Sequence, residues 1–208
     1  MLFGQIPFAG PAAGSPRQTK DVDVVVNVLN LGEYSDTLRE RFLECGLVED
    51  TRKGAPVCRW LLDDMIVDIM PTQGSILDFD CEWYPLAFES AQPVVLPNGV
   101  SIRLVTPACF LATKLAAFGD RGRHDPMASH DLEDLVSVID GRREIVADLA
   151  TAPPDLRAYV TERLSQFLAR PDADVLVAAH LMPDSDSQDR LPLVLDRIRS
   201  LIAAGSAA

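Results

Sequence analysis

The densest apolar pattern in the first half of the chain is typical of β-strands. Thr19–Val26 reads Thr-Lys-Asp-Val-Asp-Val-Val-Val, and the β-branched valines favour a pleated, largely buried strand. A second run of this kind, Met65–Met70, follows the apolar run Val57–Leu62. The acidic pair Asp63-Asp64 between these two runs predicts a β-hairpin. A small β-sheet is therefore expected in this half.

A further hairpin and one helix complete the first half. The runs Gln92–Leu96 and Val100–Val105 flank Pro97-Asn98-Gly99, and Asn-Gly is a strong signal for a hairpin turn. Apolar residues recur at helical spacing over Glu33–Cys45, and Gly46 predicts the end of that helix. Residues 1–18, rich in Gly, Pro and Ala, are expected to form a loop or loose arm, and residues 72–88 a loop or a short helix.

From Thr106 onward the apolar pattern changes to a helical period. Thr106 is a suitable N-cap and Pro107 a suitable first residue for a helix that runs to about Phe118. The order of elements predicts an α+β fold, with a small sheet and helices in residues 1–105 and a C-terminal helical half in residues 106–208. Further helices are predicted at Ser129–Ile139, Ile145–Ala150, Pro154–Ala169 and Leu191–Ala204, with loops at Gly119–Pro126, Pro171–Asp174 and Met182–Asp189.

Composition and charge narrow the class of protein. The chain has 208 residues, 48% of them hydrophobic, which suffices for a core in one domain or two small ones. No apolar run approaches the roughly 18–20 residues of a membrane span, and the N-terminus lacks the basic start of a signal peptide, so a cytoplasmic protein without a membrane partner is expected. The net charge of −12 disfavours non-specific nucleic-acid binding but allows a nucleotide or an RNA end held through a metal ion.

The four cysteines are widely spaced and form no CxxC pair, which argues against a zinc site. Each is expected to be a small, buried, apolar residue: Cys45, Cys58, Cys81 and Cys109.

Three aspartates interrupt the valine-rich strands. Asp21 and Asp23 are two residues apart, so their side chains point to the same face of a strand. Neighbouring carboxylates repel each other, and a divalent cation between them relieves that repulsion. Asp68 lies in the second strand, and three carboxylates on adjacent strands make an oxygen site suited to Mg²⁺ and a substrate phosphate. The alternative is that these acids face water at strand ends. Arg59, in the strand before Asp68, is a weaker candidate for the same cleft.

The helical half carries candidate phosphate-binding groups. Lys114 lies in a helix that is apolar on nearly all sides, which favours an ammonium facing a cleft, where it suits a triphosphate. The alternative is a lysine that snorkels to the surface. Asp131 is a candidate to pair with Lys114 or Arg121 and orient it, while Asp134 is a candidate to stabilise the start of its helix. A polar segment follows Lys114 and either clamps a phosphate or an RNA acceptor or is a solvated loop: Arg121, Arg123 and His124.

Taken together, these motifs resemble the nucleotidyltransferase superfamily typified by DNA polymerase β. They are most similar to the bacterial AbiEii-type nucleotidyltransferases, the toxin half of some toxin–antitoxin systems. The resemblance covers about residues 19–140. It rests on Thr-Lys-Asp-Val-Asp-Val at 19–24, Val-Asp-Ile-Met-Pro at 67–71, Phe-Leu-Ala-Thr-Lys-Leu-x-Ala-Phe at 110–118 and Ser-His-Asp-Leu-Glu-Asp-Leu at 129–135.

The resemblance implies a nucleotidyltransferase-like mixed β-sheet and a metal-dependent transfer of a nucleotide from an NTP to an acceptor hydroxyl. It implies that Asp21, Asp23 and Asp68 are the catalytic metal ligands for Mg²⁺, and Asp68 is also the candidate base. It further implies that Lys114 contacts the nucleotide and that Asp131 supports the site. RNA or a tRNA end is the acceptor that such toxins suggest, and an antitoxin protein is the partner.

The chain departs from the superfamily pattern before the first aspartate. A Gly-Gly or Gly-Ser turn normally ends a strand, leads into a helix and holds the nucleotide phosphates with its amides. Here no Gly-Gly precedes Asp21, and Gly14-Ser15 is only a few residues away. We therefore expect either a start inside a longer gene or the loss of that strand and helix, which would expose a sheet edge. The alternative function is a non-catalytic nucleotide-binding or interaction module of the same fold. A phosphohydrolase is a third reading, although such enzymes usually bring histidines to the metal.

Overall fold

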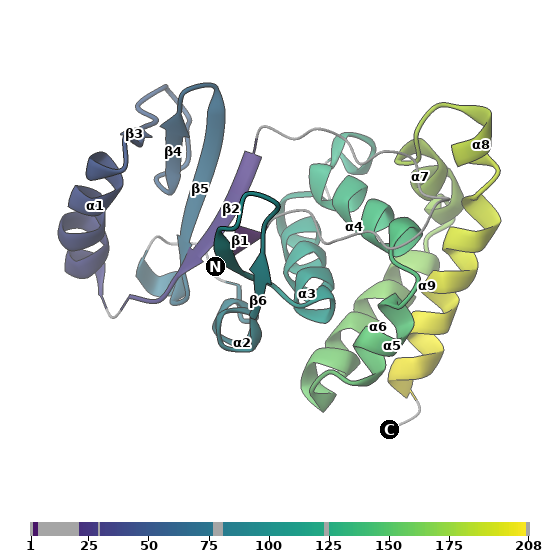
Figure 1. The fold of residues 1–208 in the computed structure, drawn as a ribbon. Coiled ribbons are helices and arrows are strands. Elements are labelled where there is room, and N and C mark those ends of the chain that lie inside the picture. Colours follow the sequence, from purple (N-terminus) through teal and green to yellow (C-terminus); the bar gives the residue numbers. More distant parts are fainter. Residues whose placement is uncertain (1, 4–20, 29, 77–80, 123–124, 207–208) are drawn as a thin grey trace. The chain divides into compact units, whose positions relative to one another are not determined.

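The computed structural model describes residues 2–3, 21–28, 30–76, 81–122 and 125–206 (Figure 1). The chain divides into two compact units, with the main boundary between Thr106 and Pro107. Strands and helices are both well represented, so the predicted α+β class is confirmed. Within the described ranges, no helix is long and apolar enough to cross a membrane.

The residues described in the first unit form a seven-stranded sheet with the order β3-β4-β5-β2-β1-β7-β6. The pairs β2–β5 and β1–β7 are parallel and the other neighbours are antiparallel, so the sheet is mixed. Both predicted hairpins are present as β4–β5 and β6–β7. The strands are β1 (Leu2–Phe3), β2 (Asp21–Val26), β3 (Val48–Glu49), β4 (Arg59–Leu62), β5 (Met65–Pro71), β6 (Gln92–Val95) and β7 (Ser101–Leu104).

Strand β1 corrects two expectations about the start of the chain. Residues 1–18 were expected to form only a loop, but Leu2 and Phe3 form a strand between β2 and β7. Phe3 pairs with Asp23 in antiparallel fashion, and Leu2 pairs with Leu104 in parallel fashion. A strand therefore precedes Asp21 and covers the edge of β2 at Asp23 and Val24, an edge that the loss of the family's first strand would have exposed. Two residues are too short to display an alternating pattern, which is also why β3 was missed.

One face of the sheet holds the apolar core of the first unit. Its side chains include Trp60, Val67 and Ile69 from three positions on β4 and β5. The helical segment predicted at Glu33–Cys45 covers this face and is confirmed, although it begins as a π-helical stretch, η1 (Glu33–Leu38), before α1 (Arg39–Glu44). The Tyr34 hydroxyl donates to the Ile69 carbonyl at 2.7 Å, and burial raises the pKa of Tyr34 far above its usual range.

Helix α2 (Tyr84–Ser90) packs against β2. It begins within residues 72–88, which were expected to form a loop or a short helix, so the second alternative holds at the end of that segment. The Tyr84 hydroxyl lies 3.0 Å from the sulfur of Met70 on β5. The Arg103 guanidinium, on β7, donates to the carbonyls of Phe88, Glu89 and Ala91. Because the last carbonyls of a helix lack partners within the helix, Arg103 serves as the C-terminal cap of α2.

The second unit is helical, as predicted. Its helix α4 begins after Ser129, whose hydroxyl accepts from the Leu132 amide at 3.3 Å, which is an N-cap. The expected loop at Met182–Asp189 is wrong from Ser185 onward, because Asp184 caps the short helix α8 through the Ser187 amide at 2.9 Å. The expected loop at Pro171–Asp174 is wrong at its end, because the helix α7 begins at Ala173. The elements are α3 (Pro107–Ala117), η3 (Phe118–Gly122), η4 (Pro126–Ala128), α4 (His130–Gly141), α5 (Ile145–Ala150), α6 (Pro154–Leu168), α7 (Ala173–Ala179), α8 (Ser185–Gln188) and α9 (Leu191–Ser206).

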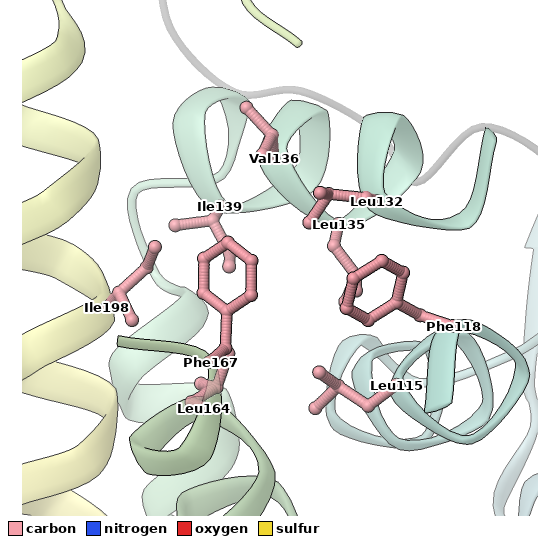
Figure 2. Close-up of a pocket in the computed structure, with 9 residues that line it drawn as sticks. All are labelled: Leu115, Phe118, Leu132, Leu135, Val136, Ile139, Leu164, Phe167 and Ile198. Carbon is pink, nitrogen blue, oxygen red and sulfur yellow. The ribbon is translucent and has the colours of Figure 1, made fainter. Parts of the chain in front are cut away.

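Apolar side chains from α3, η3, α4, α6 and α9 meet in the core of this unit (Figure 2). They surround a cavity of about 10 Å³, roughly the room of one water molecule. The lining offers no polar group that would recognise a ligand, so the cavity is a packing gap within the core. The lining residues are Leu115, Phe118, Leu132, Leu135, Val136, Ile139, Leu164, Phe167 and Ile198.

Candidate functional site

Backbone register places three charged residues in one row across the sheet. Asp23 on β2 pairs with Asp68 on the parallel strand β5, and Asp68 pairs in turn with Arg59 on the antiparallel strand β4. Paired positions on neighbouring strands project their side chains to the same face. Asp21 lies two residues before Asp23 and projects to that face as well. The face is the one opposite the core that contains Trp60 and Val67.

Arg59 holds Asp68 through a bidentate ion pair. The Arg59 Nε lies 2.8 Å from one carboxylate oxygen of Asp68, and Nη2 lies 2.7 Å from the other. The two side chains are 28% and 19% exposed, so the pair is only partly shielded from water. The hydrogen bonds to Asp68 raise the pKa of Arg59 above its ordinary value. Asp68 therefore carries its charge against a fixed guanidinium.

The importance of Arg59 was underestimated from sequence, although a signal was available. The hairpin turns through Asp63-Asp64, so Leu62 pairs with Met65. Counting outward from that pair, Arg59 falls opposite Asp68, because hairpin register follows from the length of the turn. The alternation of side chains then places both on one face.

The three carboxylates on this face of the sheet are of the chemical type that magnesium prefers. Mg²⁺ prefers carboxylate oxygens, and Asp21, Asp23 and Asp68 offer them from one face of two adjacent strands. Each oxygen of Asp68 keeps a lone pair beyond its bond to Arg59. As the side chains stand, no three His, Cys, Asp or Glu groups in the described part of the chain are close enough together to hold a metal ion. Asp68 instead directs both oxygens to Arg59.

A buried thiol lies beside the row. Cys58 is 6% exposed and directly precedes Arg59. Burial, followed by the negative charge of Asp68, raises the pKa of Cys58 to about 11. The thiol is therefore protonated at neutral pH and is no candidate nucleophile. Cys45 differs from the prediction for the cysteines, because it is exposed at the end of α1.

In the second unit, Lys114 on α3 faces two aspartates of α4. Its ammonium lies 2.7 Å from a carboxylate oxygen of Asp134 and 3.7 Å from one of Asp131. Lys114 is 13% exposed, so it does not snorkel freely into water, and it also lies 5.7 Å from the centre of the Phe110 ring. The predicted partnership with Asp131 is present. Asp134 was assigned to the helix start, but Ser129 caps the helix and Asp134 is the closer partner of Lys114.

The remaining candidates from the helical half are only partly described. The backbone of Arg121 belongs to η3, a π-helical turn where a loop was expected, and its side chain lies outside the described residues. Arg123 and His124 lie outside them entirely. The phosphate-clamp assignment of these three residues therefore stays a prediction.

Comparison with known proteins adds no relative. No protein-family model matches the chain, and no curated protein matches it in sequence.

Proposed function

We propose that the protein is a metal-dependent nucleotidyltransferase with a fold of the DNA polymerase β type, close to the AbiEii-type toxins. The observation that carries the proposal is the register of β2 and β5, which sets Asp23 opposite Asp68 with Asp21 on the same face. Aspartates are disfavoured in valine-rich strands, so their concentration on one face calls for a chemical reason. The α+β fold class, the mixed sheet and the strand β1 before Asp21 are compatible with the family pattern.

In this proposal the acids on the sheet would hold Mg²⁺. Bound there, the ion would neutralise phosphate charge and help align the reacting groups. Asp68 would take the proton of an acceptor hydroxyl, whose oxygen would bond to the α-phosphorus of an NTP as pyrophosphate leaves. The acceptor is proposed to be an RNA, with a tRNA end as the specific case, and this acceptor and an antitoxin partner follow from the resemblance alone. A cytoplasmic location is proposed because the sequence has no apolar run of the length of a membrane span.

The second unit contributes its own nucleotide-binding candidates, Lys114 and Asp131. The ammonium is a compact charge suited to phosphate, and two aspartates hold it in place. Arg121 is carried over on sequence grounds only. We propose that Asp134 orients the Lys114 ammonium together with Asp131, because Asp134 makes the shorter contact with it.

The test is transfer of radioactivity from each of four α-labelled NTPs onto total RNA in the presence of Mg²⁺. We expect labelled RNA with the wild-type protein and at least about a hundredfold loss in Asp21→Asn and Asp68→Asn, as for the loss of a metal ligand. Glu40→Gln on α1 is the control, since it removes an exposed charge from the helix that covers the opposite face. Equal activity in all four proteins would overturn the proposal.

The second candidate is a nucleotide-binding module without turnover. The observation that favours it is the engagement of both Asp68 oxygens by Arg59, with no three-ligand group formed among the described side chains. Calorimetric titration with Mg-NTP separates the two candidates. Binding without release of pyrophosphate on addition of RNA favours the module, whereas release favours the transferase.

A further inference from the structure

Arg59 is the end member of the charged row and pairs with the acid next to it, Asp68. Cross-strand neighbours on one face of a sheet lie about 5 Å apart, and like charges directly opposite each other are destabilising. Asp23 and Asp68 are such a pair. Arg59 occupies the paired position on the other side of Asp68 and neutralises it through two short hydrogen bonds.

We infer that Arg59 acts as a built-in counter-ion of Asp68. It positions the Asp68 carboxylate and lowers the affinity of the site for a divalent cation by competing with that cation. The inference rests on the proposed function, because it concerns the same three acids. Asp68 is paired with Asp23 on one side and with Arg59 on the other. A cation held by Asp23 and Asp68 would therefore be close to the Arg59 guanidinium, and the two positive charges would repel each other. The planar fork of Arg59 also fixes the plane of the Asp68 carboxylate, which a point charge cannot do.

A purely structural ion pair predicts a different outcome from a counter-ion. If Arg59 only stabilised the sheet, its loss would lower stability and leave the affinity for Mg²⁺ unchanged or weaker. If Arg59 competes with the cation, its loss lowers stability in the absence of metal and tightens Mg²⁺ binding. The direction of the change in affinity therefore separates the two roles.

The experiment measures Mg²⁺ binding without nucleotide, by calorimetry and by the rise of Tm with MgCl₂ at constant ionic strength. We expect Arg59→Gln to bind Mg²⁺ at least about tenfold more tightly than wild type, since a positive charge near the ion is gone. Arg39→Gln is the matched control. Arg39 pairs with Glu49, which is opposite Trp60 and hence on the other face of the same sheet. Its affinity should equal that of wild type.

Two further variants complete the test. In Arg59→Gln/Asp68→Asn the gain in affinity should disappear, because the competition is for Asp68. Arg59→Lys keeps the charge but not the fork, so its affinity should lie between those of wild type and Arg59→Gln. Should Arg59→Gln fail to fold, Arg59→Lys alone decides, with affinity equal to or below that of wild type counting against the inference.

The outcomes distinguish this inference from the proposed function. If the wild-type protein transfers nucleotides but Arg59→Gln binds Mg²⁺ with unchanged or weaker affinity, only the inference is overturned. Tighter Mg²⁺ binding in a protein that transfers no nucleotide supports the inference and overturns the proposed activity. Absence of Mg²⁺ binding in wild type and in every variant overturns both.

Discussion

The row Arg59–Asp68–Asp23 in the first unit and the cluster Lys114–Asp131–Asp134 in the second each combine one cationic side chain with two acidic ones. In the sheet, the partners are spaced by backbone register and the pair of Arg59 and Asp68 is 28% and 19% exposed. In the helices, the partners meet through the reach of side chains between α3 and α4, and Asp131 is only 6% exposed.

This difference separates a cluster that can be rearranged from one that is fixed in a core. The Arg59–Asp68 pair leaves lone pairs on Asp68 and lies partly open to water, so exchanging a partner there costs little. Asp131 has almost no contact with water, so removing the Lys114 ammonium takes a positive charge away from a buried carboxylate. We expect substitutions in the first cluster to change ligand binding more than stability, and substitutions in the second to lower stability as well.

The largest effect on stability is expected from Lys114→Met. Loss of the ammonium removes a positive charge from beside the buried Asp131 carboxylate, which should lower the free energy of unfolding by about 3 kcal/mol. Urea unfolding followed by circular dichroism measures the change. The control is Asp134→Asn, which removes the partner that is 45% exposed and should cost about 1 kcal/mol or less. Equal losses from the two variants would remove the distinction between the clusters.

An intermediate effect is expected at alkaline pH, from the thiol beside the sheet row. The pKa of Cys58 is raised from 9.0 to about 11, so between those values the unfolded chain has lost a proton that the native state keeps. The stabilisation from the protonated thiol is complete below about pH 9 and should decline by about 2 kcal/mol as pH rises towards 11. Urea unfolding at each pH tests this. The same series on Cys58→Ala isolates the thiol from Tyr34, and an identical slope in both proteins would contradict the assignment.

The smallest effect on stability is expected from Asp68→Asn. The substitution loses one charge-assisted hydrogen bond to Arg59 but also removes the repulsion from Asp23. These opposing terms should leave the free energy of unfolding within about 1 kcal/mol of wild type. A loss of more than about 2 kcal/mol would mean that the pair is a structural element like the helical cluster.

Much of the local structure could be read from the chain, because its elements are long enough to show a period. The valine-rich run that contains Asp21, the two hairpins and the helix after Pro107 all have such a pattern. Two-residue strands do not, and the helix α8 depends on one Asp184 cap within a polar segment that reads as a loop. Helix α7 (Ala173–Ala179) was not predicted either, although it is apolar and longer than the strands of the β6–β7 hairpin. The Asn-Gly turn signalled that hairpin, and nothing comparable marked α7.

For the candidate site, the residues could be proposed but their partners only in part. Alternation places Asp21 and Asp23 on one face, and the register of β2 against β5 then sets Asp23 opposite Asp68. Which of two aspartates contacts Lys114 depends on how α3 packs on α4, and the sequence spacing of Asp131 and Asp134 does not decide that. The pairing of Asp68 with Arg59 follows from the register of the β4–β5 hairpin, which counting outward from the turn already indicates.

The most direct test of the central claim is anomalous diffraction from crystals soaked in Mn²⁺, recorded at the manganese edge. The carboxylates that suit Mg²⁺ also suit Mn²⁺, and manganese scatters strongly enough to be placed without ambiguity. We predict a peak at the row, ligated by Asp21, Asp23 and Asp68, that is absent in Asp21→Asn/Asp68→Asn. A well-diffracting crystal with no manganese at these three side chains, or with manganese bound only elsewhere, would contradict the claim.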